Sequence, residues 1–549
     1  MLHVLSIFLD TKQLYQEKHR TPSYIPEHVL RELHLPPFKS AINAGARSIM
    51  INSGLINSIP VHSSKYILTT LLKNELGFNG VVLTDWEDIN KLVDRDKIAS
   101  SLKEAIKIAI NAGIDMSMVP YDYEQFCENL VQLVNEGEVP MTRIDDAVSK
   151  ILKLKFKLNL FEKPLSNPED YSEFGSSNHR KKAFNSAAEA ITLLKNQDNI
   201  LPIKKGRNIL VAGPNGNSMR TLNGAWSYSW QGEKTDQYTE KYNTIFEALK
   251  NKFGSKKVTF SPGISYPTNE DYDEEPKWEY YHQFKDKFNY TVKAAKNSDL
   301  VILCLGENSY TEKPGDLNDL TLNSLQIELA NAVIKTGVPV ILIINSGRPR
   351  IISKIANKVK AIVNIYLPGN YGADALASIL SGEINPSGKL PYSYPLYSNS
   401  LIPYNYKPSE IQNNSQGAYN YLGEVKNLYD FGYGLSYSKF EMDNFKINKN
   451  ELSKIDTLKI SIDVTNTSSI KGKETIQVFS KDHYASITPD FKRLRRFKKI
   501  ELNPLETKTV NFSLPINELS FVNESNNKII EAGSFDIIIN NQIQEIKVN

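Results

Sequence analysis

The stretch GFNGVVLTDWEDIN, residues 77–90, decides how the N-terminal part of this chain folds. Within it, Gly80–Thr84 is a short apolar run after a glycine-containing turn, which is typical of a strand buried on both faces of a parallel sheet. Asp85, Trp86 and two further acids come at the carboxyl end of that strand, where α/β folds bind ligands. Carboxylates beside an aromatic ring suit a sugar, because the ring stacks on the pyranose face while the acids bind hydroxyls. The alternative is structural: Asp85 caps the next helix and Trp86 belongs to the core.

The composition indicates an ordinary globular protein. A length of 549 residues predicts about two to four domains. The formal net charge of +3 is too small to indicate a nucleic-acid partner. Cys127 and Cys304 lie far apart and give neither a metal-ligand spacing nor a disulfide framework. No run of about 18 apolar residues occurs, so we expect no membrane span, and Met1–Leu9 lacks the basic start and the cleavage site of a signal peptide.

Residues 1–163 alternate between strands and helices. The expected strands are Ala46–Asn52, Gly80–Thr84 and Gly113–Met118. The expected helices are Pro37–Asn43, Lys65–Glu75, Ser101–Ala112 and Arg143–Leu158, the last of them capped by Thr142. Three strands, each followed by a helix, predict the C-terminal part of a (β/α)8 barrel. A whole barrel takes about 250 residues, so this segment is about 100 residues too short for one.

The rest of the chain predicts a linker, a second α/β domain, a connector and an all-β domain. Residues 164–185 are rich in proline, serine and asparagine and predict the linker. Residues 186–395 begin with an expected helix at Ser186–Asn196 and then alternate, which predicts an α/β sandwich with a mainly parallel sheet. Residues 396–437 form an irregular connector, and residues 438–549 predict a β-sandwich, because short alternating runs recur between turns.

The strands expected in these two domains are defined by their apolar runs. In the α/β sandwich they are Ile209–Ala212, Val258–Phe260, Leu300–Leu305, Val338–Asn345 and Ala361–Tyr366. In the β-sandwich they are Thr457–Val464, Glu474–Ser480, Lys498–Leu502, Lys508–Leu514, Phe535–Ile539 and Gln544–Val548.

A second acidic motif, GENSYTEKPGDLNDLTL (residues 306–322), follows the expected strand Leu300–Leu305. It contains Glu307, Glu312 and two aspartates. One interpretation is a solvated acidic loop, the usual fate of such a run. The other is that one of these acids forms a catalytic pair with Asp85, since glycoside hydrolysis needs two carboxylates about the scissile bond. Spacing in the sequence does not decide between them.

Motifs in one order along the chain resemble glycoside hydrolase family 3, the β-glucosidase and exo-β-glucanase type. They include ELGFNGVVLTDWEDI (Glu75–Ile89), NAGIDMSMVP (Asn111–Pro120), GAWSYSWQG (Gly224–Gly232), LGENSYTEKPGDLNDLTL (Leu305–Leu322), NSGRP (Asn345–Pro349) and LYDFGYGLSYSKF (Leu428–Phe440). The resemblance extends from about Arg20 to Asn549. It implies a barrel, an α/β sandwich and a fibronectin-III-like domain.

The resemblance also implies roles for two carboxylates. Asp85 matches the nucleophile, which attacks the anomeric carbon and forms a covalent glycosyl-enzyme with net retention. Glu312 matches the general acid/base, which protonates the leaving oxygen and then activates water. In a retaining enzyme such a pair lies about 5–5.5 Å apart. Because Asp85 and Glu312 belong to different predicted domains, docking of these two domains would be part of the catalytic machinery. Glu307 is the next acid to test if Glu312 fails.

Three further residues acquire substrate-binding roles from the resemblance. Trp86 and Trp230 match two tryptophans that clamp the sugar in the +1 subsite, and Glu87 matches a hydroxyl ligand. Arg348 is expected to hold domain packing rather than sugar. A glycine-containing turn at residues 213–217 faintly suggests nucleotide binding, but it lacks both a G-x-G-x-x-G pattern and a P-loop lysine.

The front of the chain departs from the family pattern. The Lys-His pair, the arginine and the aspartate that grip the −1 sugar in the family have no match, and residues 1–18 do not resemble it. We therefore hypothesise a chain truncated at its N-terminus, which would also have removed a signal peptide. Losing the hydrogen bonds of the −1 subsite reduces the stabilisation of the transition state. A loss of about 4 kcal/mol of that stabilisation lowers the rate about a thousandfold.

The sequence thus predicts a retaining, β-glucosidase-like hydrolase that removes terminal β-D-glucosyl residues from oligosaccharides or glucosides. β-Xylosidase and exo-glucanase specificities stay open. The rivals are an inactive remnant and a non-catalytic carbohydrate-binding protein. No cofactor or metal is expected, because two carboxylates suffice for the chemistry. A periplasmic or secreted location is expected if a signal peptide was lost, and the oligomeric state is open.

Overall fold

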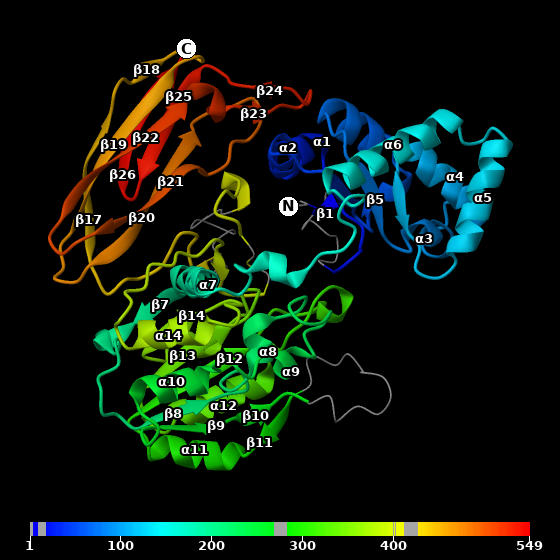
Figure 1. The fold of residues 1–549 in the computed structure, drawn as a ribbon. Coiled ribbons are helices and arrows are strands. Elements are labelled where there is room, and N and C mark those ends of the chain that lie inside the picture. The colour runs from blue at the N-terminus through cyan, green and yellow to red at the C-terminus, as the bar shows by residue number, and fades with distance from the viewer. Residues whose placement is uncertain (1–3, 9–17, 268–282, 399, 401, 411–425) are drawn as a thin grey trace, which may run out of the picture. The chain divides into compact units, whose positions relative to one another are not determined.

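The computed structural model describes residues 4–8, 18–267, 283–398, 400, 402–410 and 426–549 (Figure 1). They form two compact units. The first contains Met1–Ser172 and Phe521–Ile529, and the second contains Glu173–Ser520 and Ile530–Asn549. Within the described ranges, every helix is too short or too polar to cross a lipid bilayer.

A parallel four-stranded sheet forms the centre of the first unit. Its order is β1 (Val4–Phe8), β2 (Ser48–Ile51), β5 (Val81–Trp86) and β6 (Met116–Met118). The three expected strands are confirmed. β1 was not predicted from the sequence; it pairs with β2 in parallel, with Val4 opposite Ser48.

Helices follow these strands, as the alternating pattern predicts. They are α1 (Glu27–Val29), η1 (Leu30–His34), α2 (Leu35–Asn43), η2 (Val61–Ser63), η3 (Tyr66–Glu75), α3 (Asp88–Asp94), α4 (Leu102–Ala112), α5 (Tyr123–Asn135) and α6 (Met141–Lys157). A hairpin of β3 (Leu55–Ile56) and β4 (Ile59–Pro60) precedes η2. One apolar core joins β2 and β5 to η1, η3, α4 and α5.

Two details at the helix ends and turns of this unit differ from expectation. Thr142 is not an N-cap, because α6 already begins at Met141, after Pro140. Pro140 is the last residue in extended conformation before the helix, with φ −63° and ψ 138°, so α6 begins two residues earlier than the sequence pattern indicates. The helix expected at Lys65–Glu75 is present as η3, a wider π-helix.

The start of the second unit also corrects the sequence analysis. Residues 177–185, interpreted as the end of a linker, form the first part of α7 (Ser177–Ala190), whose first turn is capped by Ser176 accepting from the N–H of His179 at 3.3 Å. The helix expected at Ser186–Asn196 is wrong beyond Ala190. Thr192–Asn196 is strand β7, an antiparallel edge partner of β14. The first three residues of β7 are buried in the sheet. Their pairing in the sheet, rather than the helical spacing of their apolar side chains, determines the structure of this segment.

A six-stranded sheet forms the centre of the α/β part of the second unit. Its order is β7, β14 (Ala361–Asn364), β13 (Val340–Asn345), β12 (Leu300–Gly306), β8 (Ile209–Ala212) and β9 (Val258–Ser261). All pairs but that of β7 are parallel. This confirms the expected mainly parallel sheet.

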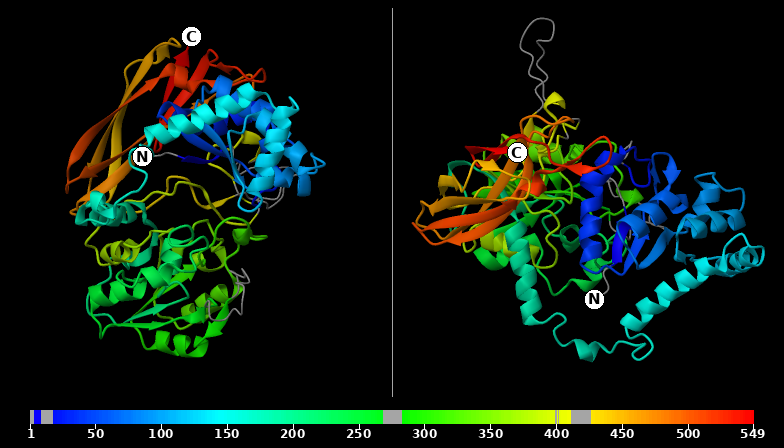
Figure 2. Two further views of the ribbon diagram at one scale, coloured as in Figure 1. Left: turned by 45° about the vertical axis from the view of Figure 1, so that its right-hand side comes forward. Right: turned by 90° about the horizontal axis from the view of Figure 1, so that it is seen from above.

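Helices cover both faces of that sheet, so it is a sandwich of three layers (Figure 2). One face packs against α7, α8 (Met219–Asn223), α10 (Ile245–Phe253) and α14 (Gly372–Leu380). The other packs against α11 (Phe288–Lys296), α12 (Ser324–Ile334) and α13 (Ser353–Ala356). Smaller elements are α9 (Thr235–Tyr238), β10 (Gly263–Ser265), β11 (Phe284–Asp286), β15 (Tyr394–Pro395) and β16 (Asn427–Tyr429).

The C-terminal part of the second unit is the expected β-sandwich. One sheet has the order β17 (Phe440–Ile447), β19 (Thr457–Asn466) and β22 (Thr507–Pro515). The other has β18 (Glu451–Leu452), β26 (Gln542–Val548), β25 (Gly533–Ile539), β20 (Gly472–Asp482) and β21 (Arg493–Leu502). Both sheets contribute alternate residues to one apolar core. The hairpin of β23 (Phe521–Val522) and β24 (Lys528–Ile529) leaves the sandwich and groups with the first unit.

Candidate functional site

Asp85 lies at the carboxyl end of β5, as the sequence predicts. Its Oδ2 accepts a hydrogen bond from Arg20 Nη2 at 3.1 Å, and its Oδ1 accepts one from the backbone N–H of Trp86 at 2.6 Å. The side chain is 18% exposed. Asp85 is therefore not the N-cap of α3, a place taken by Glu87. An ion-paired, partly exposed carboxylate at a strand end can attack a bound ligand.

An exposed aromatic ring stands beside this carboxylate. Trp86 is 50% exposed and meets Tyr121 edge to face, with ring centroids 6.5 Å apart. The interpretation of Trp86 as a core residue is therefore wrong. Glu87 follows with φ +57°, a left-handed conformation that is uncommon for glutamate and that turns the chain from β5 into α3. An aromatic ring that is exposed at the end of a strand, as that of Trp86 is, can stack on a sugar.

Behind Asp85, a buried polar cluster surrounds Asp88, which is 1% exposed. Asp88 accepts hydrogen bonds from Ser53 Oγ at 2.7 Å and from Lys91 Nζ at 2.9 Å, and His62 Nε2 lies 3.4 Å from it. Burial lowers the pKa of His62, so the imidazole is neutral near neutral pH. The sequence did not predict this cluster, because its members come from three separate segments. It anchors the first turn of α3 and so supports the chain that carries Asp85.

In the second unit, Glu312 and Trp230 are in direct contact. The indole Nε1–H of Trp230 donates to Glu312 Oε1 at 3.1 Å, although the two residues lie 82 positions apart in the sequence. Trp230 is 38% exposed. Glu312 has φ +53° and ψ −146°, a region occupied almost only by glycine. Strained backbone of this kind clusters at functional sites.

A glutamine that the sequence analysis missed fastens the loop of Trp230 to the loop of Glu312. Gln231 is fully buried, and its amide exchanges two hydrogen bonds with the backbone of Thr311: the Thr311 N–H donates at 2.9 Å and the Thr311 carbonyl accepts at 3.2 Å. Ser309 Oγ donates to the Gln231 carbonyl at 2.6 Å. Gln231 lies inside the WQG motif, but nothing in its spacing pointed to Thr311.

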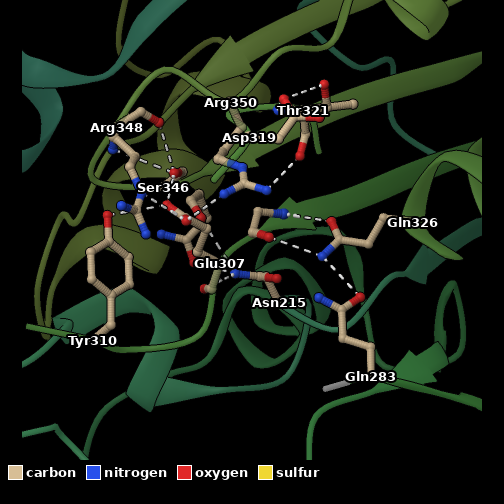
Figure 3. Close-up of polar contacts among 12 residues, drawn as sticks. Asn215, Gln283, Glu307, Tyr310, Asp319, Thr321, Gln326, Ser346, Arg348 and Arg350 are labelled. Carbon is tan, nitrogen blue, oxygen red and sulfur yellow. Dashed lines mark hydrogen bonds and ion pairs between the residues drawn. The ribbon is translucent and has the colours of Figure 1, made fainter. Parts of the chain in front are cut away.

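Glu307, the alternative acid, is engaged in a different way (Figure 3). It is 8% exposed, and its Oε1 accepts from Arg348 Nε at 3.0 Å and from Arg350 Nη1 at 3.1 Å. Its Oε2 accepts from Tyr310 at 3.2 Å and from Ser346 at 2.5 Å. Both oxygens of this buried carboxylate are therefore occupied by other side chains of the protein. Arg348 pairs with Glu307 and lies over the ring of Tyr310, 4.1 Å from its centroid.

The described residues thus carry two groups of candidate side chains, one in each unit. The first unit holds Asp85, Trp86 and Glu87, with Arg20 as an unpredicted partner. The second holds Glu312 and Trp230, with Gln231 as the unpredicted support. Among the described residues, no group of three or more His, Cys, Asp or Glu side chains is arranged to hold a metal ion.

Family models match most of the chain. The glycosyl hydrolase family 3 N terminal domain matches residues 14–154, the glycosyl hydrolase family 3 C-terminal domain matches residues 191–437, and the fibronectin type III-like domain matches residues 474–542. The first match begins at residue 14, a few residues before the resemblance at Arg20. The partial barrel, the α/β sandwich and the fibronectin-III-like domain expected from the sequence are therefore confirmed.

Curated relatives extend the similarity along the chain. A lysosomal beta glucosidase of Dictyostelium discoideum is 37% identical over 547 residues, which cover 96% of this chain and 63% of the relative. A beta-xylosidase of Formosa agariphila is 33% identical, covering 94% and 70%. A periplasmic beta-glucosidase of Salmonella typhimurium is 30% identical, covering 92% and 67%. This chain thus spans about two thirds of the length of these relatives.

Solved structures show the same architecture. A beta-glucosidase from Listeria innocua in complex with isofagomine has a TM-score of 0.88 at 27% identity, covering all of this chain and 75% of that one. A beta-glucosidase involved in saponin metabolism from intestinal bacteria has a TM-score of 0.88 at 25% identity, covering all of this chain and 77% of that one. Both the sequence matches and the fold lead to one conclusion: this chain belongs to glycoside hydrolase family 3.

Proposed function

We propose that this chain hydrolyses terminal β-D-glucosidic bonds with retention, with Asp85 as nucleophile and Glu312 as general acid/base. The observation that carries the proposal is the 3.1 Å hydrogen bond between Trp230 and Glu312. The two residues were assigned separately, one to sugar binding and one to proton transfer. Their contact supports both assignments, because an acid/base must lie beside the ring that holds the leaving group.

Asp85 suits the role of nucleophile. Covalent glycosyl transfer needs an ionised carboxylate whose free lone pair faces the sugar. Arg20 offsets the negative charge of Asp85 through a single contact at 3.1 Å, and the Trp86 N–H occupies the other oxygen. Carboxylate oxygens have about four lone-pair sites, so two hydrogen bonds leave room for attack on the anomeric carbon.

The proposed substrate is a β-glucoside or a short oligosaccharide with a terminal β-D-glucosyl residue. Trp86 and Trp230 are 50% and 38% exposed, and each offers a ring for stacking on a sugar. Glu87 adds an acceptor for sugar hydroxyls. The relatives include β-glucosidases and a β-xylosidase, so a β-xyloside is the second substrate to try.

The test is hydrolysis of an aryl β-D-glucoside by the full chain, with trapping by azide. Glycine in place of Asp85 should abolish turnover, and azide should restore it as α-glucosyl azide, because azide then attacks the substrate from the face of the missing carboxylate. Alanine in place of Glu312 should leave slow turnover that azide accelerates, giving β-glucosyl azide from the covalent intermediate.

A matched control is Asp94→Gly, an exposed acid at the end of α3 that should leave turnover unchanged. Azide products of the same configuration from both catalytic variants would refute the two assigned roles. A folded chain that binds the glucoside without turning it over would refute hydrolysis and favour a carbohydrate-binding protein.

A further inference from the structure

A cavity of about 220 Å3 lies in the first unit, at the amino ends of β2 and β5. Arg47 immediately precedes β2 and Gly80 immediately precedes β5, and both line the cavity. The turn 77–80 and the C-terminal half of α6 supply most of the remaining lining. Asp85 lies at the other, carboxyl end of β5. The cavity is therefore separate from the groups assigned to hydrolysis.

Among the described residues that line this cavity, four are cationic and none is acidic. The cations are Arg47, Lys150, Lys153 and Lys157. Lys150 is buried and already has an anionic partner, because its Nζ lies 2.7 Å from Asp146 Oδ2. The side chains of the other three form neither a hydrogen bond nor an ion pair within the described part of the chain. The cavity thus brings together three cations that have no anionic partner in the protein.

The sequence of α6 places its lysines on the side of the cavity. Lys150, Lys153 and Lys157 recur at i, i+3 and i+7, so they lie on one face of the helix. Like charges at this spacing repel and destabilise a helix. Lys157 has a structural reason to be there, because α6 ends at this residue and a cation complements the helix dipole. That reason does not extend to Lys153 or Arg47, so their position beside the cavity indicates a bound anion.

Two glycines in the lining keep the space open. Gly45 and Gly77 have φ of +97° and +69°, the left-handed region in which a residue with a side chain is strained. A Cβ added to either glycine would meet no atom within 4 Å, so the space beside them is empty. Gly80 has a different role, because an added Cβ would lie 2.3 Å from the Arg47 carbonyl oxygen. This part of the wall is therefore backbone, which leaves room for a ligand.

We propose that this cavity binds a phosphate group, as inorganic phosphate or as the end of a small soluble phosphomonoester. A phosphate group has a charge of about −1.5 to −2 at neutral pH and several acceptor oxygens, so separate cations can each contact one of them. The guanidinium of Arg47 can bind two of these oxygens, while the lysines act as point charges. The volume equals that of about seven water molecules in the liquid, which is enough for inorganic phosphate and a small substituent.

The apolar side chains on α6 favour a soluble ligand over a lipid headgroup. Val148, Leu152 and Phe156 are exposed and recur at i, i+4 and i+8, so they form one apolar face. Leu152 lies two residues after Lys150, which is about 200° around the helix axis, so this face points away from the cavity. A membrane that bound the apolar face would therefore leave the cavity on the far side of the helix.

The test is calorimetric titration of the full chain with inorganic phosphate and with glycerol 3-phosphate, in a phosphate-free buffer of low ionic strength. We expect saturable binding of one ligand per chain, at least about tenfold tighter than the binding of acetate. Arg47→Gln and Lys153→Gln should each weaken both phosphates at least about fivefold, because each removes a cation from the cavity. Asn79→Trp should weaken them as well, because the indole occupies the space of the ligand. All three positions are exposed, so the variants should fold.

The matched control is Lys155→Gln, which makes the same change of charge at an exposed position of α6 outside the lining and should bind phosphate as the wild type does. Equal losses of affinity in Lys155→Gln and Lys153→Gln would mean that net charge, and not the cavity, attracts the anion, and would overturn the proposal. Absence of saturable binding, or acetate that binds as tightly as phosphate, would also overturn it. So would binding to vesicles of phosphatidylcholine and phosphatidic acid without binding of either soluble phosphate.

Discussion

The amide of Gln231 offers the sharpest test of how the proposed acid/base is positioned. Replacing it with methionine keeps a side chain of similar length but removes both hydrogen bonds to Thr311, at 2.9 and 3.2 Å. Thr311 immediately precedes Glu312, whose φ of +53° must be held by its surroundings. We therefore expect Gln231→Met to lower stability and to displace Glu312.

The size of the effect follows from the two hydrogen bonds. An unpaired buried donor or acceptor costs about 1–3 kcal/mol, so losing both partners would cost roughly 2–6 kcal/mol in a dry site. Thr311 is only partly buried, so water can replace part of the loss. We expect the free energy of unfolding to fall by about 2 kcal/mol. Gln231→Glu keeps an acceptor for the Thr311 N–H but places a carboxylate oxygen against the Thr311 carbonyl oxygen. This variant should therefore lower the free energy of unfolding by a similar amount.

The assay combines urea unfolding with rates on two glucosides. General acid catalysis contributes about 10²- to 10⁴-fold, so a displaced Glu312 should slow an alkyl β-glucoside by at least about tenfold. A 2,4-dinitrophenyl β-glucoside has a leaving group that needs no proton, so its glycosylation rate should change little. Gln237→Met, at an exposed position of α9, is the matched control and should leave both rates and stability unchanged.

Two outcomes would refute this reasoning. A change in unfolding free energy below about 0.5 kcal/mol, the usual range of surface substitutions, would mean that the amide does not hold the two loops together. Equal losses of rate on the alkyl and dinitrophenyl glucosides would mean that Gln231 supports the loop without positioning the proton donor.

Three other charged groups give predictions. Arg20→Gln should lower kcat on an aryl β-glucoside by at least about tenfold without a comparable rise in KM, since it removes the ion pair with Asp85; unchanged kinetics would contradict the pairing. Glu307→Gln removes the negative charge that both Arg348 and Arg350 contact and should lower the free energy of unfolding by about 3 kcal/mol in urea, whereas an unchanged midpoint would contradict it. Burial lowers the pKa of Lys73 to about 8, against the attraction of Asp115. Above pH 8 the folded chain has released the proton of Lys73, whereas the unfolded chain still holds it. The unfolding free energy of the wild type, measured relative to Lys73→Met, should therefore rise by about 1.4 kcal/mol per pH unit between pH 8 and 10. A difference between the two proteins that does not change with pH would refute this prediction.

Elements set by an apolar run were predictable from the sequence. Strand β8 was predicted with its exact bounds, and β12 and β13 to within one or two residues, because buried parallel strands are nearly continuous runs of apolar residues. The errors fell where tertiary pairing decides. Residues 192–196 have helical spacing but complete the sheet beside β14, and β1 depends on its pairing with β2. The local sequence pattern of a strand does not show which other strand it pairs with, so neither of these two pairings could be predicted.

The candidate site also has features that could be predicted from the sequence and features that could not. Asp85 lies at the carboxyl end of one buried parallel strand and Glu307 directly follows another, so their location could be predicted from the sequence. Their chemistry could not, because it depends on partners from distant segments: one arginine for Asp85, against two for Glu307. Arg20 leaves Asp85 with room for a substrate, whereas the arginines, a tyrosine and a serine saturate Glu307. The same strand-end position therefore yields a candidate nucleophile in one unit and a structural anion in the other.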